Sequence, residues 1–301
     1  MALCGLQIKA RCRMMYIVTV LRQMLHGVWG SHMLNQFRES RGRLKEAYRA
    51  VSLAEKIAFC AIVAFALGTL VYCVTIGDVT NIVLCLLVIV AMLAPRFLEW
   101  LFMVRFSVFF KVFVMCYIAC GAILGSVFEF YYLFKNWDTL LHVICGFLMA
   151  LVGFVALDVL NHHAASHISL ASRVLFALTF ALAAAVVWEF YEYAVDTFLN
   201  FDMQCDTVVH SIKSYLVGDS PLVVDTIDNI TEVTINGVDL GLGGYLDLGH
   251  IDTMNDMLSN TAGGVLFCVL ALTVRKPGSW FSRLFVPAFV WKESTSKEEQ
   301  N

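Results

Sequence analysis

The feature that most constrains this chain is a series of six uncharged runs, each 15 to 21 residues long and free of Asp, Glu, Lys and Arg. An α-helix rises ~1.5 Å per residue, so these runs approach the ~30 Å hydrocarbon core of a bilayer. We expect six membrane-spanning helices, at about residues 57–77, 79–95, 110–131, 138–158, 174–194 and 254–274. The sequence therefore predicts an all-α, polytopic membrane protein whose transmembrane domain covers residues 57–275.

The composition agrees with this class and argues against others. Of the 301 residues, 59% are hydrophobic and 15% are charged, whereas a soluble domain has about 45–50% apolar and about 25% charged residues. A single soluble core could not hide several runs of near-spanning length. Membrane lipids are the expected partners, and nucleic acid is not expected to bind.

The distribution of charge along the chain predicts the orientation of the helices. Residues 1–56 carry ten Lys or Arg against three Glu, which is typical of a cytoplasmic flank. Six crossings place the tail, residues 276–301, on the same side, so both termini are expected in the cytoplasm. Between residues 197 and 256 there are ten acidic residues and one basic residue, Lys213. The acidic loop 199–251 is therefore expected outside the cytoplasm.

This acidic loop also carries signals for β-structure. Residues 222–226 and 231–235 are β-prone, and Asn236-Gly237 is a hairpin turn signal. We expect a small, outward-facing insertion with a β-hairpin.

Ionisable side chains inside or at the ends of the expected spans gather at one end of three helices. Each costs ~2.5–3.5 kcal/mol on insertion scales, so each is a candidate for function. Residues three, four, seven or eight apart share a helix face, and this spacing relates the members of three sets. The sets are Asp138 and His142; Glu189, Glu192 and Asp196; and Asp252, Asp256 and Asn260. Polar stripes in lipid turn toward one another, so we expect the three sets to converge near the outer leaflet.

Glu189 is the most informative of these residues. Only 15 uncharged residues separate it from Arg173, which corresponds to about 22 Å of helix at ~1.5 Å per residue. Its carboxyl group must therefore lie within the hydrocarbon region, where it has to share protons or hold a cation.

Converging carboxylates with one imidazole suit a divalent cation. The expected metal ligands are Asp138, His142, Glu189, Glu192, Asp252 and Asp256, and the expected further lining residues are Glu129, Trp137, Asp196 and Asn260. Oxygen-rich ligation with one nitrogen suits Mg, Mn or Ca, and Zn suits the site if His142 and two carboxylates dominate. If a reaction follows, His142 or Glu189 is the expected catalytic base.

Structural roles are the alternative for several of these residues. Asp138 and Asp252 could complement the helix macrodipole at helix N-termini. Glu129 and Glu192 could be solvated residues at the membrane interface, and Trp137 could belong to an aromatic interfacial belt.

Three sequence blocks carry a resemblance to a known family. They are Trp137-Asp138-Thr139-Leu140-Leu141-His142, Trp188-Glu189-Phe190-Tyr191-Glu192-Tyr193, and Asp252-Thr253-Met254-Asn255-Asp256 with Asn260. In this order they resemble the YjdF-like family of bacterial inner-membrane proteins. More distantly, the chain looks like the VanZ-like proteins, which are associated with glycopeptide resistance. The first resemblance implies a bacterial cytoplasmic membrane and a polytopic helical fold, and it implies no reaction.

Three functions remain open from the sequence. The leading hypothesis is an outward-facing intramembrane site that binds a divalent metal and, through it, a phosphorylated lipid or isoprenoid headgroup, with hydrolase-like or transferase-like chemistry. The second is a proton- or ion-coupled transporter, in which buried carboxylates relay ions. The third is a non-catalytic lipid-binding or assembly protein. Motifs of P-loop, G-x-S-x-G or H-E-x-x-H type are absent from the sequence.

Overall fold

The computed structural model describes residues 38, 41–42, 51–163, 167–219, 222–274 and 278–290. Within these residues, six helical segments are long and apolar enough to cross a membrane: Leu53–Ile76, Val79–Phe102, Val108–Val127, Trp137–Asn161, Leu170–Leu199 and His250–Thr273. The predicted all-α architecture of about six spans is confirmed. Most of the expected N-terminal segment 1–56 and much of the expected tail 276–301 lie outside the described residues.

A tight turn at Gly77 and Asp78 joins the first two spans. Helix α3 (Leu53–Ile76) ends at Gly77, whose φ of 73° is a left-handed conformation that glycine adopts without steric cost. Helix α4 (Val79–Ala91) begins at Asp78, which accepts a hydrogen bond from the backbone N–H of Asn81 (3.0 Å). This bond and a second one from the Asn81 side chain (2.7 Å) lower the pKa of the Asp78 carboxyl group.

The second span has a break near Pro95. Helix α4 ends at Ala91, and α5 (Ala94–Phe102) begins with Pro95 in its first turn, where a missing backbone N–H costs nothing. The expected span 79–95 ends at this proline, whereas the helix resumes and continues to Phe102. The additional turns carry Glu99 into the protein interior, where it is 2% exposed.

The third span is an α-helix that widens into a π-helix. Helix α6 (Val108–Ala119) is capped by Ser107, whose hydroxyl oxygen accepts a hydrogen bond from the N–H of Phe110 (3.0 Å). It continues as the π-helix η1 (Cys120–Val127), which ends four residues before the expected boundary at 131. The chain then turns at Glu129, with φ of 59°, into the short helix α7 (Phe130–Leu133).

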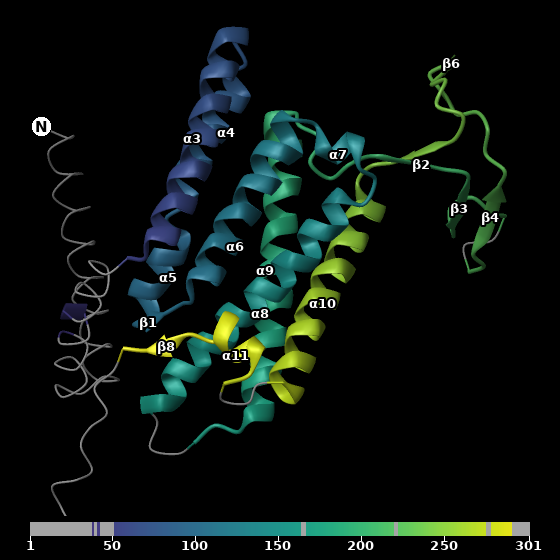
Figure 1. The fold of residues 1–301 in the computed structure, drawn as a ribbon. Helices are drawn as coiled ribbons and strands as arrows, with labels where there is room; N and C mark the ends of the chain where they lie inside the picture. Colours follow the sequence, from purple (N-terminus) through teal and green to yellow (C-terminus); the bar gives the residue numbers. More distant parts are fainter. Residues whose placement is uncertain are drawn as a thin grey trace, which may run out of the picture.

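Helices α8 (Trp137–His163), α9 (Leu170–Leu199) and α10 (His250–Thr273) pack against one another as a three-helix unit (Figure 1). Glycines allow α8 and α10 to approach closely. A Cβ atom on Gly146 would overlap the backbone carbonyl of Asn260, and one on Gly263 would overlap that of Val143. Small residues at such crossings let helix backbones meet in a membrane. This contact fixes the spacing of α8 and α10 one turn from His142.

Two apolar cores meet on α6. One face of α6 contributes Phe110 to a core with Phe154 of α8 and Phe267 of α10. The other face contributes Met115 to a smaller core with Ala66 of α3. The first core is closed by α11 (Trp280–Leu284) and by strand β8 (Ala288–Phe289), which pairs antiparallel with β1 (Val104–Arg105).

The connection between α9 and α10 is an insertion of short antiparallel strand pairs that extends away from the helices in Figure 1. In its described residues, β2 (Thr207–Val209) pairs with β7 (Tyr245–Asp247), β3 (Ser211–Ser214) with β4 (Asp225–Asp228), and β5 (Thr234–Ile235) with β6 (Val238–Asp239). The expected hairpin at Asn236-Gly237 is present, because both residues have positive φ (55° and 82°), as a two-residue hairpin turn requires. The β-prone segment 222–226 is not part of that hairpin, since its strand begins at Asp225 and pairs with β3.

Candidate functional site

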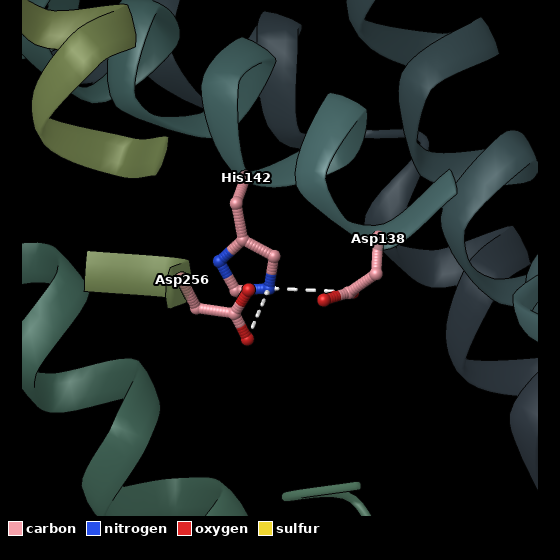
Figure 2. A group of neighbouring side chains, drawn as sticks. All are labelled: Asp138, His142 and Asp256. Carbon is pink, nitrogen blue, oxygen red and sulfur yellow. Dashed lines mark ion pairs between the residues drawn. The ribbon is translucent and has the colours of Figure 1, made fainter. Parts of the chain in front are cut away.

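Helix α8 supplies two of the predicted site residues in its first turns. Asp138 and His142 are four residues apart and therefore lie one above the other on the same helix face. His142 is buried, and its Nε2 lies 3.5 Å from Oδ1 of Asp138 and 3.4 Å from Oδ2 of Asp256 (Figure 2). The imidazole thus stands between a carboxylate of its own helix and one of α10.

Helix α10 supplies Asp256 and Asn260, again four residues apart on one face. Asp256 is 3% exposed and Asn260 is 2% exposed. The side-chain nitrogen of Asn260 lies 2.9 Å from Nδ1 of His142 and donates a hydrogen bond to the backbone carbonyl of Asp256 (3.2 Å). Asn260 therefore contacts the ring nitrogen of His142 that faces away from the carboxylates and helps to fix the ring orientation.

Helix α9 supplies Glu189 and Glu192, and each is 5% exposed. The indole N–H of Trp188 donates a hydrogen bond to Oε1 of Glu192 (2.7 Å). Both carboxylate oxygens of Glu189 and Oε2 of Glu192 are buried and have no hydrogen-bond partner among the described residues. Buried polar atoms are normally hydrogen-bonded, so three unpartnered carboxylate oxygens require an explanation.

The side chains of three helices form two groups of three potential metal ligands in the described part of the chain. The first group is Asp138, His142 and Asp256; the second is Glu189, Glu192 and Asp256. Within each group, the ligand atoms all lie within 4.8 Å of one another. The predicted convergence of three helices is therefore present in the structure. We call Asp138, His142, Glu189, Glu192, Asp256 and Asn260 together the acidic site.

The other predicted site residues lie outside both groups. Asp196 accepts hydrogen bonds from the backbone N–H groups of Met203 (2.6 Å) and Gln204 (2.8 Å), which fixes the loop after α9. Gln204 in turn donates a hydrogen bond to the hydroxyl of Thr253 (2.6 Å), which links this loop to α10. Asp196 thus has a positioning role near the acidic site.

The remaining three residues lie at the edge of the acidic site or beyond it. Asp252 is half-buried in the first turn of α10 and belongs to neither group of ligands. Glu129 is exposed at the turn before α7. Trp137 packs edge-on against Phe130, with ring centroids 5.0 Å apart. These positions agree with the structural alternatives for Asp252, Glu129 and Trp137.

The sequence pattern did not predict a second buried cluster, at the opposite end of the transmembrane domain. Nζ of Lys111 lies 2.8 Å from Oε2 of Glu55 and 3.5 Å from Oε1 of Glu99. Arg96 lies 3.7 Å from Oε1 of Glu55, and Oε1 of Glu99 accepts a hydrogen bond from the N–H of Phe106 (2.9 Å). We call Glu55, Arg96, Glu99 and Lys111 the ion-pair cluster. The sequence does contain a clue to this cluster. Its acidic and basic residues lie near the ends of spans that should meet on the same side of the membrane, because successive helices cross it in opposite directions.

Comparison with known proteins places the chain in a family. Residues 57–277 match the family described as predicted membrane protein (DUF2238). The chain belongs to this family. The YjdF-like proteins are DUF2238 proteins, so that resemblance is confirmed, whereas the VanZ-like relationship receives no support. The match to DUF2238 contains every residue of the acidic site. No curated protein and no solved structure matches the chain.

Proposed function

We propose that this multi-pass membrane protein binds a divalent cation at the acidic site and, through that cation, a phosphorylated lipid or isoprenoid headgroup. The observation that supports the proposal is the pair of three-ligand groups that share Asp256, with ligand atoms within 4.8 Å of one another. Ligand atoms bound to one ion at 2.0–2.6 Å are at most about 5 Å apart, so this spacing suits ligation without large movement.

The charge of the acidic site gives a physical reason for a cation. Asp138, Glu189, Glu192 and Asp256 are four carboxyl groups, and His142 is their only cationic ion-pair partner in the described part of the chain. Burying carboxylates without compensation is unfavourable by several kcal/mol for each ion. A divalent cation would compensate this charge and would satisfy the oxygens of Glu189 and Glu192 that lack partners.

The contact between Asn260 and His142 is compatible with ligation by His142. The amide of Asn260 presents an oxygen or a nitrogen to Nδ1, depending on its orientation. With the oxygen toward the ring, Asn260 would accept a hydrogen bond from Nδ1–H and leave the Nε2 lone pair free for a metal, at the loss of its hydrogen bond to the Asp256 carbonyl. Metal-ligating histidines commonly donate their other N–H group to an oxygen in this way.

The position of the acidic site supports a membrane-resident ligand. Its residues lie on three helices that are long and apolar enough to span a bilayer, in the first turns of α8 and α10 and in the second half of α9. A headgroup at the membrane interface could reach this level, and a cation would offset the repulsion between phosphate and the carboxylates. Such a cation would supply a Lewis acid for hydrolysis or group transfer at phosphorus, and the general base would be Glu189, through an oxygen that does not bind the cation, or His142 if it is left unligated.

Elemental analysis of the detergent-purified protein tests the metal part of the proposal. We expect stoichiometric divalent metal in the wild type and a reduced amount in Glu189→Gln, because the amide keeps the shape of the side chain and removes its charge. Glu232→Gln is the matched control, since Glu232 is exposed in the insertion. Equal metal content in Glu189→Gln, Glu232→Gln and the wild type would contradict ligation by Glu189.

Mass spectrometry of co-purified lipids tests the headgroup. We expect a phosphorylated lipid or isoprenoid to accompany the wild type and Glu232→Gln and to be depleted in Glu189→Gln. An unchanged lipid profile in Glu189→Gln, at a reduced metal content, would overturn the headgroup and leave the cation site standing.

We also propose that the acidic site lies on the outer side of a bacterial inner membrane, with both termini in the cytoplasm. The excess of Lys and Arg in residues 1–56 and of acidic residues in the insertion supports this orientation. In a cysteine-free version of the protein, Asn236→Cys should react with an impermeant reagent in intact cells. His167→Cys should react only after permeabilisation. The reverse labelling pattern would overturn the orientation.

A further inference from the structure

We infer that the acidic site holds two divalent cations bridged by the carboxylate of Asp256, an inference that rests on the proposed cation binding. Among the described residues, one group of ligands combines α8 with α10, and the other combines α9 with α10. Asp256 is the member common to both. A carboxylate has two oxygens with about four lone-pair sites, so one Asp can bind two ions.

The geometry gives each cation its own ligands. The first centre would have Asp138 and His142, whose carboxylate oxygen and ring nitrogen lie 3.5 Å apart. The second centre would have Glu189 and Glu192, which are three residues apart on α9 and both 5% exposed. Two-metal sites in proteins have ions about 3.5–4 Å apart, a distance that one bridging carboxylate spans.

The charges favour two cations over one. Asp138, Glu189, Glu192 and Asp256 together carry a charge of −4 when ionised, which two divalent cations neutralise with a neutral His142 as an additional ligand. With a single divalent cation, two of the four carboxyl groups would have to be protonated or remain as negative charges without Lys or Arg partners in the described ranges. Uncompensated buried charge is strongly destabilising, so the second cation has an electrostatic reason to bind.

The unpartnered oxygens independently indicate a ligand at the second centre. His142 already lies between Asp138 and Asp256, so the first centre has internal contacts. Both oxygens of Glu189 and one oxygen of Glu192 have no hydrogen-bond partner in the described structure, although these side chains are more than nine-tenths buried. A cation held only by Asp138, His142 and Asp256 would leave these oxygens unsatisfied.

A pair of cations narrows the class of ligand. Two ions about 3.5–4 Å apart bind two oxygens of one phosphoryl group, and this is the arrangement of two-metal phosphatases and nucleases. The ligand class is therefore a phosphomonoester or phosphodiester with two free oxygens on a single phosphorus. An amine headgroup offers the two ions no oxygen and would not bind them.

Titration of the metal-free, detergent-purified full chain with Mn²⁺ tests this inference. We expect two Mn²⁺ bound per chain and an electron paramagnetic resonance spectrum with the broadened signal of a spin-coupled pair. One Mn²⁺ per chain, with the hyperfine lines of an isolated ion, would overturn the two-cation inference and leave the proposed cation site intact. No bound Mn²⁺ would overturn both, and two uncoupled ions would overturn the bridge through Asp256.

Paired variants assign the two centres. Glu189→Gln with Glu192→Gln should keep one Mn²⁺ per chain, as should Asp138→Asn with His142→Gln, and each should show an isolated-ion spectrum. Asp239→Asn is the matched control in the exposed insertion and should keep the coupled pair. Because the wild-type stoichiometry and coupling decide the inference by themselves, a variant that fails to fold does not prevent the test. Retention of two coupled ions in either double variant would overturn this assignment of ligands.

Discussion

Two buried charged clusters lie at opposite ends of the same transmembrane domain, and they differ in how their charges are compensated. The ion-pair cluster has two carboxylates and two cationic side chains, with Lys111 in contact with both Glu55 and Glu99. The acidic site has four carboxylates and one imidazole. Both clusters are desolvated, so burial alone does not distinguish a structural cluster from a functional one.

The two clusters differ in whether every buried carboxylate oxygen has a hydrogen-bond or ion-pair partner within the described part of the protein. In the ion-pair cluster, Glu99 also accepts a hydrogen bond from the backbone of Phe106, and none of its carboxylate oxygens is among the described buried atoms that lack a partner. In the acidic site, three carboxylate oxygens of Glu189 and Glu192 lack one. The ion-pair cluster therefore joins helices through contacts that are complete by themselves, whereas the acidic site has unpartnered oxygens, which supports the proposed cation.

The largest effect is expected when the ion-pair cluster loses its central cation. Lys111→Met should lower the free energy of unfolding by about 3–5 kcal/mol, because it leaves Glu55 and Glu99 buried beside each other without Lys111 between them. Denaturant unfolding in detergent micelles, followed by tryptophan fluorescence, measures the change. Lys135→Met removes an exposed lysine and is the control, with an expected change within about 0.5 kcal/mol. Similar losses in the two variants would show that the cluster does not stabilise the fold.

The next effect is that of Glu189→Gln on the free energy of unfolding. Its sign should depend on whether divalent cations are present. Glu189→Gln removes one of several mutually repelling carboxylates, so in chelator it should leave stability unchanged or raise it by about 1 kcal/mol or more. In excess Mn²⁺, the wild type should gain about 2.7 kcal/mol for each bound cation at a concentration 100 times its Kd, and the variant should lose much of that gain. Glu99→Gln, in the ion-pair cluster, should be destabilising in both conditions. Identical behaviour of the two variants would remove the distinction between the clusters.

A smaller effect concerns the backbone contact that positions the acidic site. Gly146→Ala should lower the free energy of unfolding by about 1–3 kcal/mol, because its Cβ would overlap the carbonyl of Asn260 and separate α8 from α10. Gly68→Ala is the matched control in α3, where no atom lies within 4 Å of the position that a Cβ would take, and alanine there should be neutral or stabilising by up to ~1 kcal/mol. Thermal unfolding of both variants measures the difference. A neutral Gly146→Ala would mean that α8 and α10 have room to separate.

The sequence predicts those parts of the acidic site that depend on the period of a single helix. Asp138 with His142, and Asp256 with Asn260, are each four residues apart, and their common helix face follows directly from ~3.6 residues per turn. Their convergence follows from the cost of polar groups in lipid, which turns polar stripes inward. The hairpin at Asn236-Gly237 is likewise local, because the turn residues determine it.

Contacts between distant helices are less accessible to sequence reasoning. The pairing of Glu55, Glu99 and Lys111 depends on how α3, α5 and α6 pack, and no period within one helix encodes it. The burial of Glu99 is also hard to predict because of Pro95. A proline usually indicates the end of a helix, whereas Pro95 lies in the first turn of α5. The pairing of β3 with β4 joins segments that no short turn connects, so the turn signal at Asn236-Gly237 does not identify the partner of residues 222–226.

The smallest effect is expected at Asp252, which precedes Asp256 by one helical turn on the same face. Both residues are predicted metal ligands from the sequence. In the described structure, only Asp256 belongs to a group whose ligand atoms lie within 4.8 Å of one another. In the first turn of α10, Asp252 complements the partial positive charge of the helix N-terminus. Asp252→Asn should therefore leave the bound Mn²⁺ unchanged, whereas Asp256→Asn should reduce it sharply, although each change replaces the same charge with the same amide. Metal titration of the two variants separates the roles, and a loss of Mn²⁺ in Asp252→Asn would extend the acidic site by one turn toward the insertion.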